Sequence, residues 1–351
     1  MINEIKSIEL FASILFISHI DAKGGSLPKK PTPTLTGRTV RCLLFDLGDT
    51  LWFRKDLAVW QQLENASNAQ AAALLRQTVA PVSLLDRSDI ALGQHLRDAT
   101  DEQIRIMIRQ DPGLEPDCAH AVVQVLQQWS IEGVTRDIGA AVFEALRVRI
   151  PGSRPLFDDV LSTLTILQQR GFQLGIVTNR HWGGQLFQED LQTLGLLNFF
   201  DPRHIAISAD LGIRKPNPAI FLHALNALHI PPEEAVMVGD SLKADIPGSK
   251  MLNIFTVWKP KPGVHRQTHL IATGATTAAL STPIFPEAGY GGERYDNLSE
   301  GLLITDDDYV LAHVQNREGR WDQHMQSDIE PDLIIENVSD LLDIFTEVGV
   351  Q

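Results

Sequence analysis

The chain has 351 residues, 44% of them hydrophobic, and a formal net charge of −14. This length is sufficient to bury one large core or two smaller ones. The negative charge opposes non-specific binding to nucleic acid and to anionic membranes, so we expect neither as a partner. The two cysteines, Cys42 and Cys118, give no disulfide framework. We expect them to be buried thiols of a protein in the reducing cytoplasm.

Residues 1–39 are predicted to be an N-terminal extension and linker. Residues 10–17 (LFASILFI) form an apolar run that is too short to cross a bilayer. The run also lacks the basic region and the small-residue cleavage site of a secretory signal. Residues 24–37 then cluster Pro and Gly, which sustain neither a helix nor a strand.

From Val40 onward, apolar runs alternate with amphipathic stretches. The predicted strands are residues 40–46, 172–178, 204–208, 235–240, 253–258 and 332–336. The predicted helices are residues 158–169, 184–194, 218–228, 242–251 and 338–345. This alternation is typical of the α/β class with a doubly wound, Rossmann-like parallel sheet. The site of such a fold lies at the carboxyl ends of the strands.

Two insertions interrupt this core, which we assign to residues 40–54, 154–259 and 331–351. Residues 55–153 are rich in Ala, Leu and Gln, and their clearest helices are residues 60–77 and 118–131. Because this block separates two neighbouring strands, we predict that it is a helical cap over the carboxyl edge of the sheet. Residues 260–330 are rich in Gly, Pro and acidic residues, with little periodicity outside 309–315. We assign no role to this second insertion.

Polar residues occur where the predicted strands end. Asp46 ends the first strand before a turn that contains Gly48, which favours a nucleophile or a ligand for a hard metal. At the end of the second strand, the Thr178 hydroxyl and the backbone amides from Asn179 onward can hold a phosphoryl oxygen. Lys215, in a loop restrained by prolines, can present its charge to a phosphate and to an attacking carboxylate.

Asp240 and Asp245 stand at the end of a later strand and in the first turn of the next helix. This spacing lets both carboxylates face one cation. In chain order the four motifs are DLGDTL (46–51), VTNR (177–180), GIRKPNPAIF (212–221) and VGDSLKAD (238–245). Together they resemble the four motifs of the haloacid dehalogenase superfamily, over residues 40–336 without the second insertion. The resemblance implies a phosphatase-like hydrolase with a helical cap after the first motif.

The resemblance also implies roles for the matching residues. Asp46 would attack a phosphate ester and form an aspartyl-phosphate. Lys215 would offset charge in the transition state, and the phosphate would be bound by Thr178, the Asn179 backbone amide and Lys215. The implied substrate is a small phosphorylated metabolite. Neither its identity nor the oligomeric state follows from the motifs.

A magnesium ion is the implied cofactor. Its ligands would be Asp46, the backbone carbonyl of Gly48, Asp240 and, directly or through water, Asp245. Such an oxygen-only set suits magnesium better than zinc, for which the sequence shows no cluster of His and Cys.

Gly48 departs from the pattern of the family. Phosphatases of the superfamily usually carry at this position an aspartate whose side chain is the general acid. Here the backbone carbonyl remains, but the proton donor does not, and Asp49 follows one place later. General acid catalysis contributes roughly 10²- to 10⁴-fold. We therefore expect a slow enzyme, a good leaving group or a substitute donor.

Two other functions remain open on the sequence. A haloalkanoate dehalogenase also lacks the second aspartate, although it has no need of the magnesium arrangement at Asp240 and Asp245. The second alternative is a binding module that binds magnesium and phosphate with little turnover. In such a module, the glycine at position 48 would account for the loss of activity. Retention of Asp46 with Lys215 argues against this second alternative, because a buried charged pair is costly.

Three further features have simpler interpretations. Trp182 is expected either to contact substrate or to pack at the cap. Asp306, Asp307 and Asp308 indicate a solvated acidic turn rather than a metal site, since alternating ligand spacing is absent. His181 is a candidate for the missing acid, although a histidine in a loop is more often simply exposed.

Overall fold

The computed structural model describes residues 35, 37–54, 57–78, 87–261 and 331–350. Several predicted segments lie outside the described residues. They are the apolar run at residues 10–17, most of the linker at 24–37, and the insertion at 260–330 beyond its first two residues, including Asp306 to Asp308.

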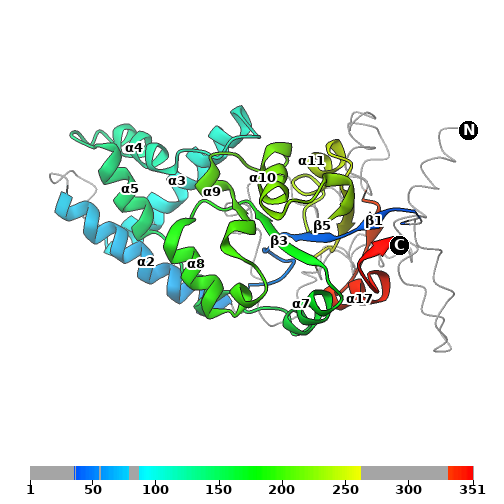
Figure 1. Cartoon of the computed structure of the whole chain (residues 1–351). Coiled ribbons are helices and arrows are strands. Elements are labelled where there is room, and N and C mark those ends of the chain that lie inside the picture. The colour runs from blue at the N-terminus through cyan, green and yellow to red at the C-terminus, as the bar shows by residue number, and fades with distance from the viewer. Residues whose placement is uncertain (1–34, 36, 55–56, 79–86, 262–330, 351) are drawn as a thin grey trace, which may run out of the picture.

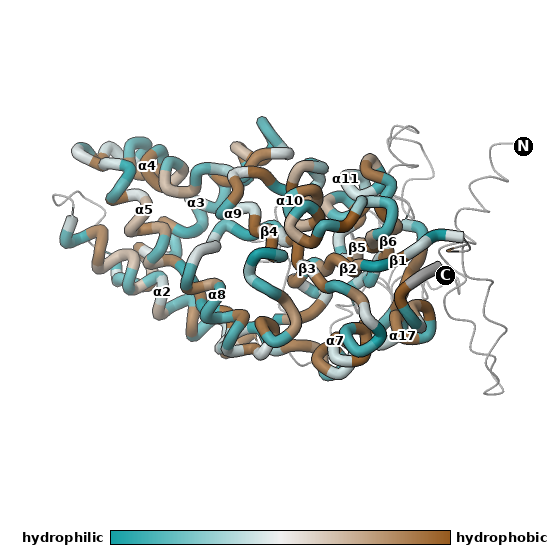
Figure 2. Tube along the Cα trace, viewed as in Figure 1, coloured by the Kyte–Doolittle hydropathy of each residue, from teal (hydrophilic) through white to brown (hydrophobic). Residues whose placement is uncertain are grey.

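Six parallel strands form the central sheet, in the order β4-β3-β2-β5-β6-β7. The strands are β2 (Cys42–Phe45), β3 (Gln173–Thr178), β4 (Ile205–Ile207), β5 (Ala235–Gly239), β6 (Phe255–Trp258) and β7 (Leu333–Ile334). The predicted doubly wound parallel sheet is confirmed. Its strand β2 lies between β3 and β5 and is buried along its whole length, and Figure 2 shows β2, β3 and β5 among the apolar stretches of the sheet.

Helices cover both faces of the sheet because successive side chains of each strand point to opposite faces. Leu43 and Phe45 belong to one cluster with the helices α7 (Val160–Gln169), α8 (Gly184–Thr193) and α17 (Leu341–Ile344). Leu44 belongs to a second cluster with α10 (Pro218–Leu228). Figure 1 shows α10 and α11 (Ile246–Met251) on one side and α7 and α17 on the other. Each fully buried Leu or Phe contributes about 1.5–3 kcal/mol.

Most of the residues between β2 and β3, those before α7, form a separate helical block. Its helices are α2 (Leu57–Thr78), α3 (Asp89–Gln110), α4 (Cys118–Gln128) and α5 (Arg136–Ala145). They enclose a hydrophobic cluster of their own, with Leu96, Val122 and Leu126 among its buried members. Figure 1 shows this block at one end of the molecule, opposite β1 and α17. None of the described helices has both the length and the apolar character that a membrane span requires.

The short elements complete the described chain. A two-stranded antiparallel sheet, which the sequence analysis does not predict, pairs β1 (Thr39–Val40) with β8 (Gly349–Val350). The short helices are α6 (Ile150–Ser153), α9 (Ser208–Leu211) and the 3-10 turns η2 (Leu196–Asn198), η3 (Pro202–His204), η4 (Pro232–Glu234) and η5 (Val338–Asp340).

One predicted helix begins later than the sequence indicates. The helix predicted at residues 242–251 starts at Ile246, because residues 241–245 form a tight turn. In that turn the Ser241 hydroxyl accepts a hydrogen bond from the Ala244 backbone N–H at 3.2 Å. The Asp245 carboxylate accepts one from the Ser241 backbone N–H at 2.9 Å. The turn aims Asp245 back at the end of β5 instead of along a helix.

The close approach of α2 and α3 requires a glycine. A Cβ atom on Gly93 would lie 2.0 Å from the backbone oxygen of Asn68, whereas one on Gly152 would meet only a Leu63 methyl at 3.5 Å. We predict that Gly93→Ala lowers the free energy of unfolding by about 1–3 kcal/mol through overpacking. Gly152→Ala should leave the free energy of unfolding unchanged or raise it. Urea unfolding of both variants measures this, and equal stability of the two would contradict it.

Candidate active site

Three adjacent strands bring polar residues to one edge of the sheet. Thr178 is the last residue of β3, and Asp46 and Asp240 directly follow β2 and β5. In the register of the sheet, Phe45 pairs with Ile176 and with Val238, which sets these chain ends next to one another. Asp46, Thr178 and Asp240 are 5%, 2% and 3% exposed. Two carboxylates and a hydroxyl are therefore held together, away from solvent, at the carboxyl edge.

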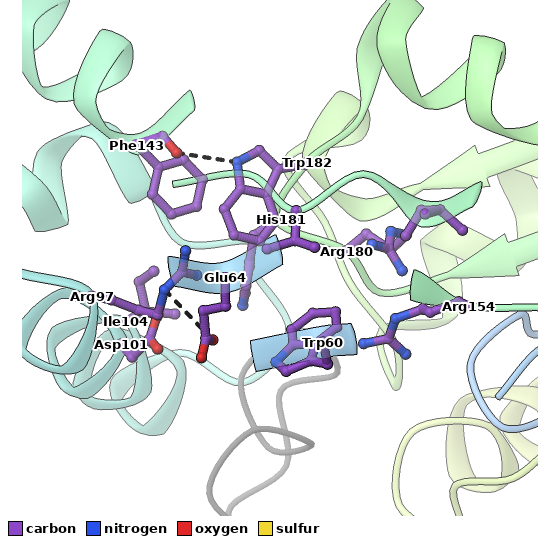
Figure 3. Close-up of a pocket in the computed structure, with 12 residues that line it drawn as sticks. Trp60, Glu64, Arg97, Asp101, Ile104, Phe143, Arg154, Arg180, His181 and Trp182 are labelled. Carbon is purple, nitrogen blue, oxygen red and sulfur yellow. Dashed lines mark hydrogen bonds and ion pairs between the residues drawn. The ribbon is translucent and has the colours of Figure 1, made fainter. Parts of the chain in front are cut away.

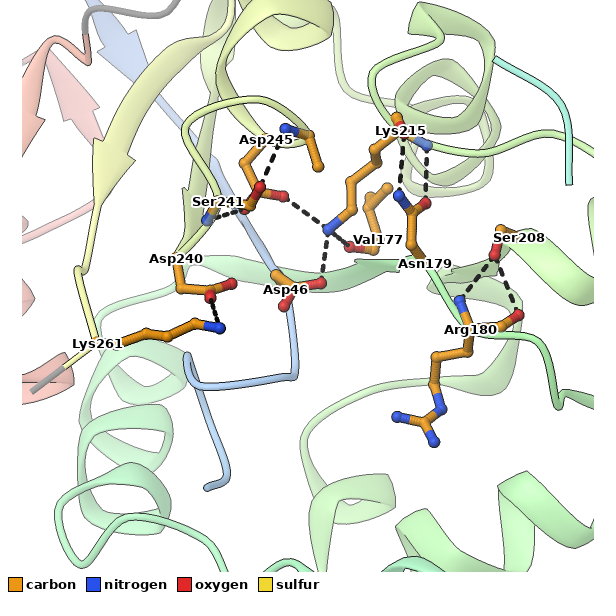
Figure 4. A network of polar contacts seen from close by, with 11 residues as sticks. Asp46, Val177, Asn179, Arg180, Ser208, Lys215, Asp240, Ser241, Asp245 and Lys261 are labelled. Atoms are coloured by element: carbon orange, nitrogen blue, oxygen red, sulfur yellow. Dashed lines mark hydrogen bonds and ion pairs between the residues drawn. The ribbon is translucent and has the colours of Figure 1, made fainter. Parts of the chain in front are cut away.

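Lys215 connects this edge to Asp245 (Figure 4). Its ammonium donates to Asp46 Oδ1 at 2.5 Å, to Asp245 Oδ1 at 2.7 Å and to the Val177 backbone oxygen at 2.8 Å. Burial alone lowers the pKa of Lys215, but the carboxylates of Asp245 and Asp46 outweigh burial and raise it above its usual value. The lysine is therefore a fixed positive charge beside Asp46.

Asn179 holds the loop that carries Lys215. Its side-chain oxygen accepts a hydrogen bond from the Lys215 backbone N–H at 2.8 Å, and its amide donates to the Lys215 backbone oxygen at 3.0 Å. From the sequence, only the backbone amide of Asn179 is predicted to have a role, which is to bind the phosphate. The side chain has the further task of clamping both backbone groups of Lys215.

Asp245 is shared between Lys215 and the turn after β5. One carboxylate oxygen accepts from Lys215, and the other accepts from the Ser241 backbone N–H. Gly239 allows this approach, because a Cβ atom there would lie 2.1 Å from Asp245 Oδ2. Burial, together with the Asp46 charge, raises the pKa of Asp245 to about 6 although Lys215 opposes the rise. Both oxygens already have protein partners, so a role as metal ligand stays a prediction.

Asp49 pairs with Lys261 and not with Lys215. Its carboxylate lies 3.2 Å from the Lys261 ammonium, and its backbone oxygen accepts a hydrogen bond from Lys259 at 2.9 Å. Burial raises the pKa of Asp49, but Lys261 and the two arginines Arg154 and Arg54 lower it by more, so the net shift is downward. An ionised, ion-paired carboxylate is a poor proton donor.

The donors at the sheet edge fit a magnesium ion. The Asp46 and Asp240 carboxylates and the Gly48 carbonyl are hard oxygen donors on adjacent chain ends. Asp240 Oδ2 lies 3.7 Å from the Lys261 ammonium, at the more open side of the edge. The three carboxylates of Asp46, Asp240 and Asp245 are buried beside the two ammonium groups of Lys215 and Lys261, so negative charge predominates there. A divalent cation offsets such an excess.

A pocket lies between the sheet edge and the helical block (Figure 3). Its lining residues are Trp60, Glu64, Arg97, Asp101, Ile104 and Phe143 from α2, α3 and α5, Val148 and Ile150 from the chain that follows α5, and Arg154, Arg180, His181 and Trp182 from outside residues 55–153. Arg154 lies 5.6 Å from the Trp60 ring centre. Arg180 and His181 directly follow Asn179, so the pocket adjoins the end of β3.

Trp182 packs against the helical block, as one of its two expected roles requires. Its ring stacks on Phe143 of α5 with centres 4.6 Å apart, and its indole N–H donates to the Phe143 backbone oxygen at 3.4 Å. The same side chain lines the pocket, so packing at the cap does not remove it from the space available to a ligand.

His181 is buried, which corrects the expectation that this loop histidine is exposed. Its side chain is 2% exposed, and Nδ1 lies 2.5 Å from Glu115 Oε1. The other oxygen of Glu115 is 3.2 Å from the Arg214 guanidinium. Burial raises the pKa of Glu115, but His181 and Arg214 outweigh burial and lower it. Glu115 thus joins the helical block to two loops of the sheet edge.

Folding also brings a cysteine to this place, which corrects the expectation of no His and Cys cluster. Ligand atoms of Glu115, Cys118 and His181 lie within 4.8 Å of one another. Burial raises the pKa of the Cys118 thiol well above its usual value, and a thiol is a weaker ligand than a thiolate. Arg214 already neutralises the carboxylate. The cluster is therefore better described as an ion-paired contact than as a zinc site. Both cysteines are buried, as expected.

Sequence reasoning missed several residues of the site. Lys259 and Lys261 fall at the predicted boundary of the second insertion, although a basic pair directly after a strand that neighbours Asp240 is a usable signal. Glu115 gives no such signal. It lies in the loop between α3 and α4, and only the folded chain brings it to His181.

Comparison with known proteins identifies the family. The sequence model of the haloacid dehalogenase-like hydrolases matches residues 40–253, more than half of the chain. The chain therefore belongs to this family of hydrolases, and the resemblance carried by the four motifs is confirmed.

The curated relatives that we compared are phosphatases. A glyceraldehyde 3-phosphate phosphatase of Methanopyrus kandleri is 41% identical over 105 residues, which cover 29% of this chain and 42% of the relative. The enzyme of the same name from Pyrococcus furiosus is 41% identical over 110 residues, 31% of this chain and 41% of the relative. The chain thus spans about two fifths of the length of these relatives.

The crystal structure of a HAD phosphatase from Thermococcus onnurineus has a TM-score of 0.47 and 20% identity, covering 88% of this chain and 100% of that one.

The Glu115 contact should dominate the stability of the junction. Glu115→Ala leaves the buried Arg214 guanidinium without its carboxylate, and breaking a buried pair in this way costs about 3–5 kcal/mol. Glu102→Ala serves as the control, because Glu102 pairs with Arg105 and Arg109 on an exposed helix face, where such pairs contribute less than about 1 kcal/mol. Urea unfolding compares the two variants. A loss below 1 kcal/mol in Glu115→Ala would show that the junction does not depend on this ion pair.

Proposed function

We propose that this member of the haloacid dehalogenase-like hydrolase family is a phosphatase that hydrolyses small phosphate monoesters through an aspartyl-phosphate on Asp46. One observation carries the proposal: the ammonium of Lys215 lies buried between the carboxylates of Asp46 and Asp245, at the edge of the sheet. A nucleophilic carboxylate with a fixed cation beside it is suited to attack on a dianionic phosphate, because the cation offsets the charge repulsion. The names of the curated relatives support a small phosphate ester as substrate.

The proposed reaction has two steps. In the first, a carboxylate oxygen of Asp46 bonds to phosphorus while the bond from phosphorus to the ester oxygen breaks, and the alcohol leaves with a proton. In the second, water attacks the phosphorus of the acyl phosphate, which releases phosphate and restores the carboxylate, and the proton that this water gives up replaces the one that left with the alcohol. The Thr178 hydroxyl and the Asn179 backbone N–H bind the phosphoryl oxygens, and Lys215 offsets the charge that develops on them. Asn179 and Asp245 keep Lys215 in place.

Magnesium belongs to the proposal as cofactor. Asp46, the Gly48 carbonyl and Asp240 would hold it, with Asp245 as a further candidate, and the ion would supply Lewis-acid polarisation of the phosphoryl group. Lys215 is the positive charge that the chain itself places beside the Asp46 carboxylate. The oxygen-only donor set at the sheet edge supports this choice of metal.

The helical block is proposed to be the cap that selects the substrate. We retain residues 55–153 as the cap, residues 40–54, 154–259 and 331–351 as the core, and residues 1–39 and 260–330 as peripheral segments. The pocket between α2, α3, α5 and the end of β3 supports this division, because side chains from both parts line it. A cytoplasmic location is part of the same proposal.

Asp46 is predicted to be indispensable. Asp46→Asn keeps the size of the side chain and removes the anionic nucleophile, so the kcat for p-nitrophenyl phosphate should fall by at least about 10³-fold. Asp201→Asn, which changes an aspartate in the loop before β4 whose partner is the exposed Arg203, should retain wild-type turnover. Undiminished hydrolysis in Asp46→Asn would exclude the mechanism. Release of halide from 2-chloropropionate, with no phosphate hydrolysis, would instead support the carbon–halogen alternative.

Binding of Mg²⁺ can be measured independently of turnover, through the Tm of the protein. Magnesium that binds the folded protein should raise its Tm, by an amount that grows with the logarithm of the ion concentration. The rise should disappear in Asp240→Asn and persist in Asp201→Asn. Chelation by EDTA should remove phosphatase activity, and excess Mg²⁺ should restore it. A Tm that does not respond to Mg²⁺, together with full activity in EDTA, would exclude a role for the ion.

A further inference from the structure

The loop after Asp46 offers no side chain that can protonate a leaving group. Gly48 has none, and the carboxylate of Asp49 is held by Lys261 at 3.2 Å. Lys261 itself lies between Asp49 and Asp240. Departure of an alkoxide without a proton is slow, since its conjugate acid has a high pKa. A proton donor for such substrates has to come from another element.

His181 supplies a titratable ring at the pocket that adjoins the end of β3. Nδ1 lies 2.5 Å from Glu115 Oε1. The opposite ring nitrogen, Nε2, is buried and has no hydrogen-bond partner among the described residues. His181 lines the pocket between cap and core, three positions after Thr178 (Figure 3). A buried polar atom without a partner is uncommon and calls for an explanation.

The contact with Glu115 determines which nitrogen of His181 is available. A carboxylate on Nδ1 fixes the tautomer that carries hydrogen there, which makes Nε2 the nitrogen that can exchange a proton with a ligand. The ring therefore has one nitrogen anchored and one free to exchange a proton. This is the arrangement of a base or acid oriented by a third group.

Docking of the cap does not explain the free nitrogen. Backbone hydrogen bonds already join the loop of Glu115 to the loop of Lys215, from Glu115 to the Gly212 oxygen at 3.1 Å and from Arg214 to the Gly113 oxygen at 3.2 Å. Arg214 pairs with the second oxygen of Glu115. The contact between His181 and Glu115 uses Nδ1 alone, and it leaves Nε2 without a partner among the described residues.

We propose that His181 is the general acid and base of the reaction and that Glu115 is its positioning residue, an inference that rests on the phosphatase function proposed above. As the bond between phosphorus and the ester oxygen breaks, the proton on Nε2 passes to that oxygen and a neutral alcohol leaves. Neutral His181 then takes a proton from the water that attacks the aspartyl-phosphate, which restores the imidazolium. The substrate class that benefits is the alkyl phosphates, whose alcohols are poor leaving groups.

The test measures how the rate depends on the leaving group. Wild-type protein and His181→Gln are assayed with Mg²⁺ on a series of phosphate esters whose alcohols range in pKa from nitrophenols to simple alkanols. In wild type, kcat/KM should change little across the series. In His181→Gln, it should fall by about 10²- to 10⁴-fold for alkyl esters and by less than about tenfold for p-nitrophenyl phosphate. In Glu115→Gln, kcat/KM should depend on the pKa of the leaving alcohol more steeply than in wild type and less steeply than in His181→Gln.

Matched variants separate this role from a structural one. His95→Gln makes the same substitution at a cap histidine that stacks on Trp129 and does not line the pocket, so its leaving-group series should follow that of wild type. Unfolding midpoints check that each variant is folded. If His181→Gln does not fold, Glu115→Gln provides a second variant for the same test.

Each outcome has one interpretation. A uniform loss across all esters in His181→Gln would show a structural histidine and overturn the inference, while Asp46-dependent hydrolysis of the aryl ester would still support the phosphatase. A steep series already present in wild type would also overturn it. If no ester is hydrolysed in a manner that depends on Asp46, the proposed function fails and the role of His181 fails with it.

Discussion

The buried ammonium of Lys215 is the charge on which the site depends. Removing a charged group from water costs several kcal/mol, and its partners repay this only when the geometry is good. Lys215 has three acceptors between 2.5 and 2.8 Å, two of them carboxylates. Each acceptor belongs to a different part of the sheet edge: Asp46 after β2, Val177 in β3 and Asp245 after β5. The same contacts that stabilise the lysine therefore fix the relative positions of three chain segments.

Because the Lys215 loop is also held by the helical block, the position of Lys215 and the docking of this block are physically coupled. Gly113 and Glu115, which precede α4, hydrogen-bond to Arg214 and Gly212. From the other side, the Asn179 amide clamps the backbone of Lys215. Any separation of the Glu115 loop from the core breaks these contacts next to the lysine. The loop of Lys215 thus responds directly to the position of the cap.

The fold and the motif residues could be predicted because they depend on local patterns. The buried run of β2 and the length of α10 follow from apolar periodicity, and α10 has the predicted bounds of residues 218–228. Residues that end parallel strands converge by topology alone, which brings Asp46, Thr178 and Asp240 together.

The helix predicted at 242–251 failed at its start because Ser241 and Asp245 satisfy the turn with side-chain hydrogen bonds, which periodicity does not register. Glu115 and His181 are 66 positions apart. Contacts over such a separation depend on how the cap docks, and no local pattern specifies that.

The backbone at Asp49 explains why a proton donor has to come from so far away. Asp49 has a positive φ of 48°, a conformation that aspartate tolerates better than most residues. With its carbonyl held by Lys259 and its carboxylate by Lys261, neither end of the residue is able to turn toward Asp46 without losing a buried contact. A change of rotamer therefore does not recover the acid that Gly48 lacks. An alternative donor has to sit on a different element, lie close in the chain to the proposed phosphate-binding residues and keep one atom free of protein partners. His181 meets these requirements, since it follows Thr178 and Asn179 in the chain and its Nε2 remains without a partner among the described residues. The substitution at position 48 and the ion pair at Glu115, which look unrelated in the sequence, are then two parts of one arrangement for moving a proton.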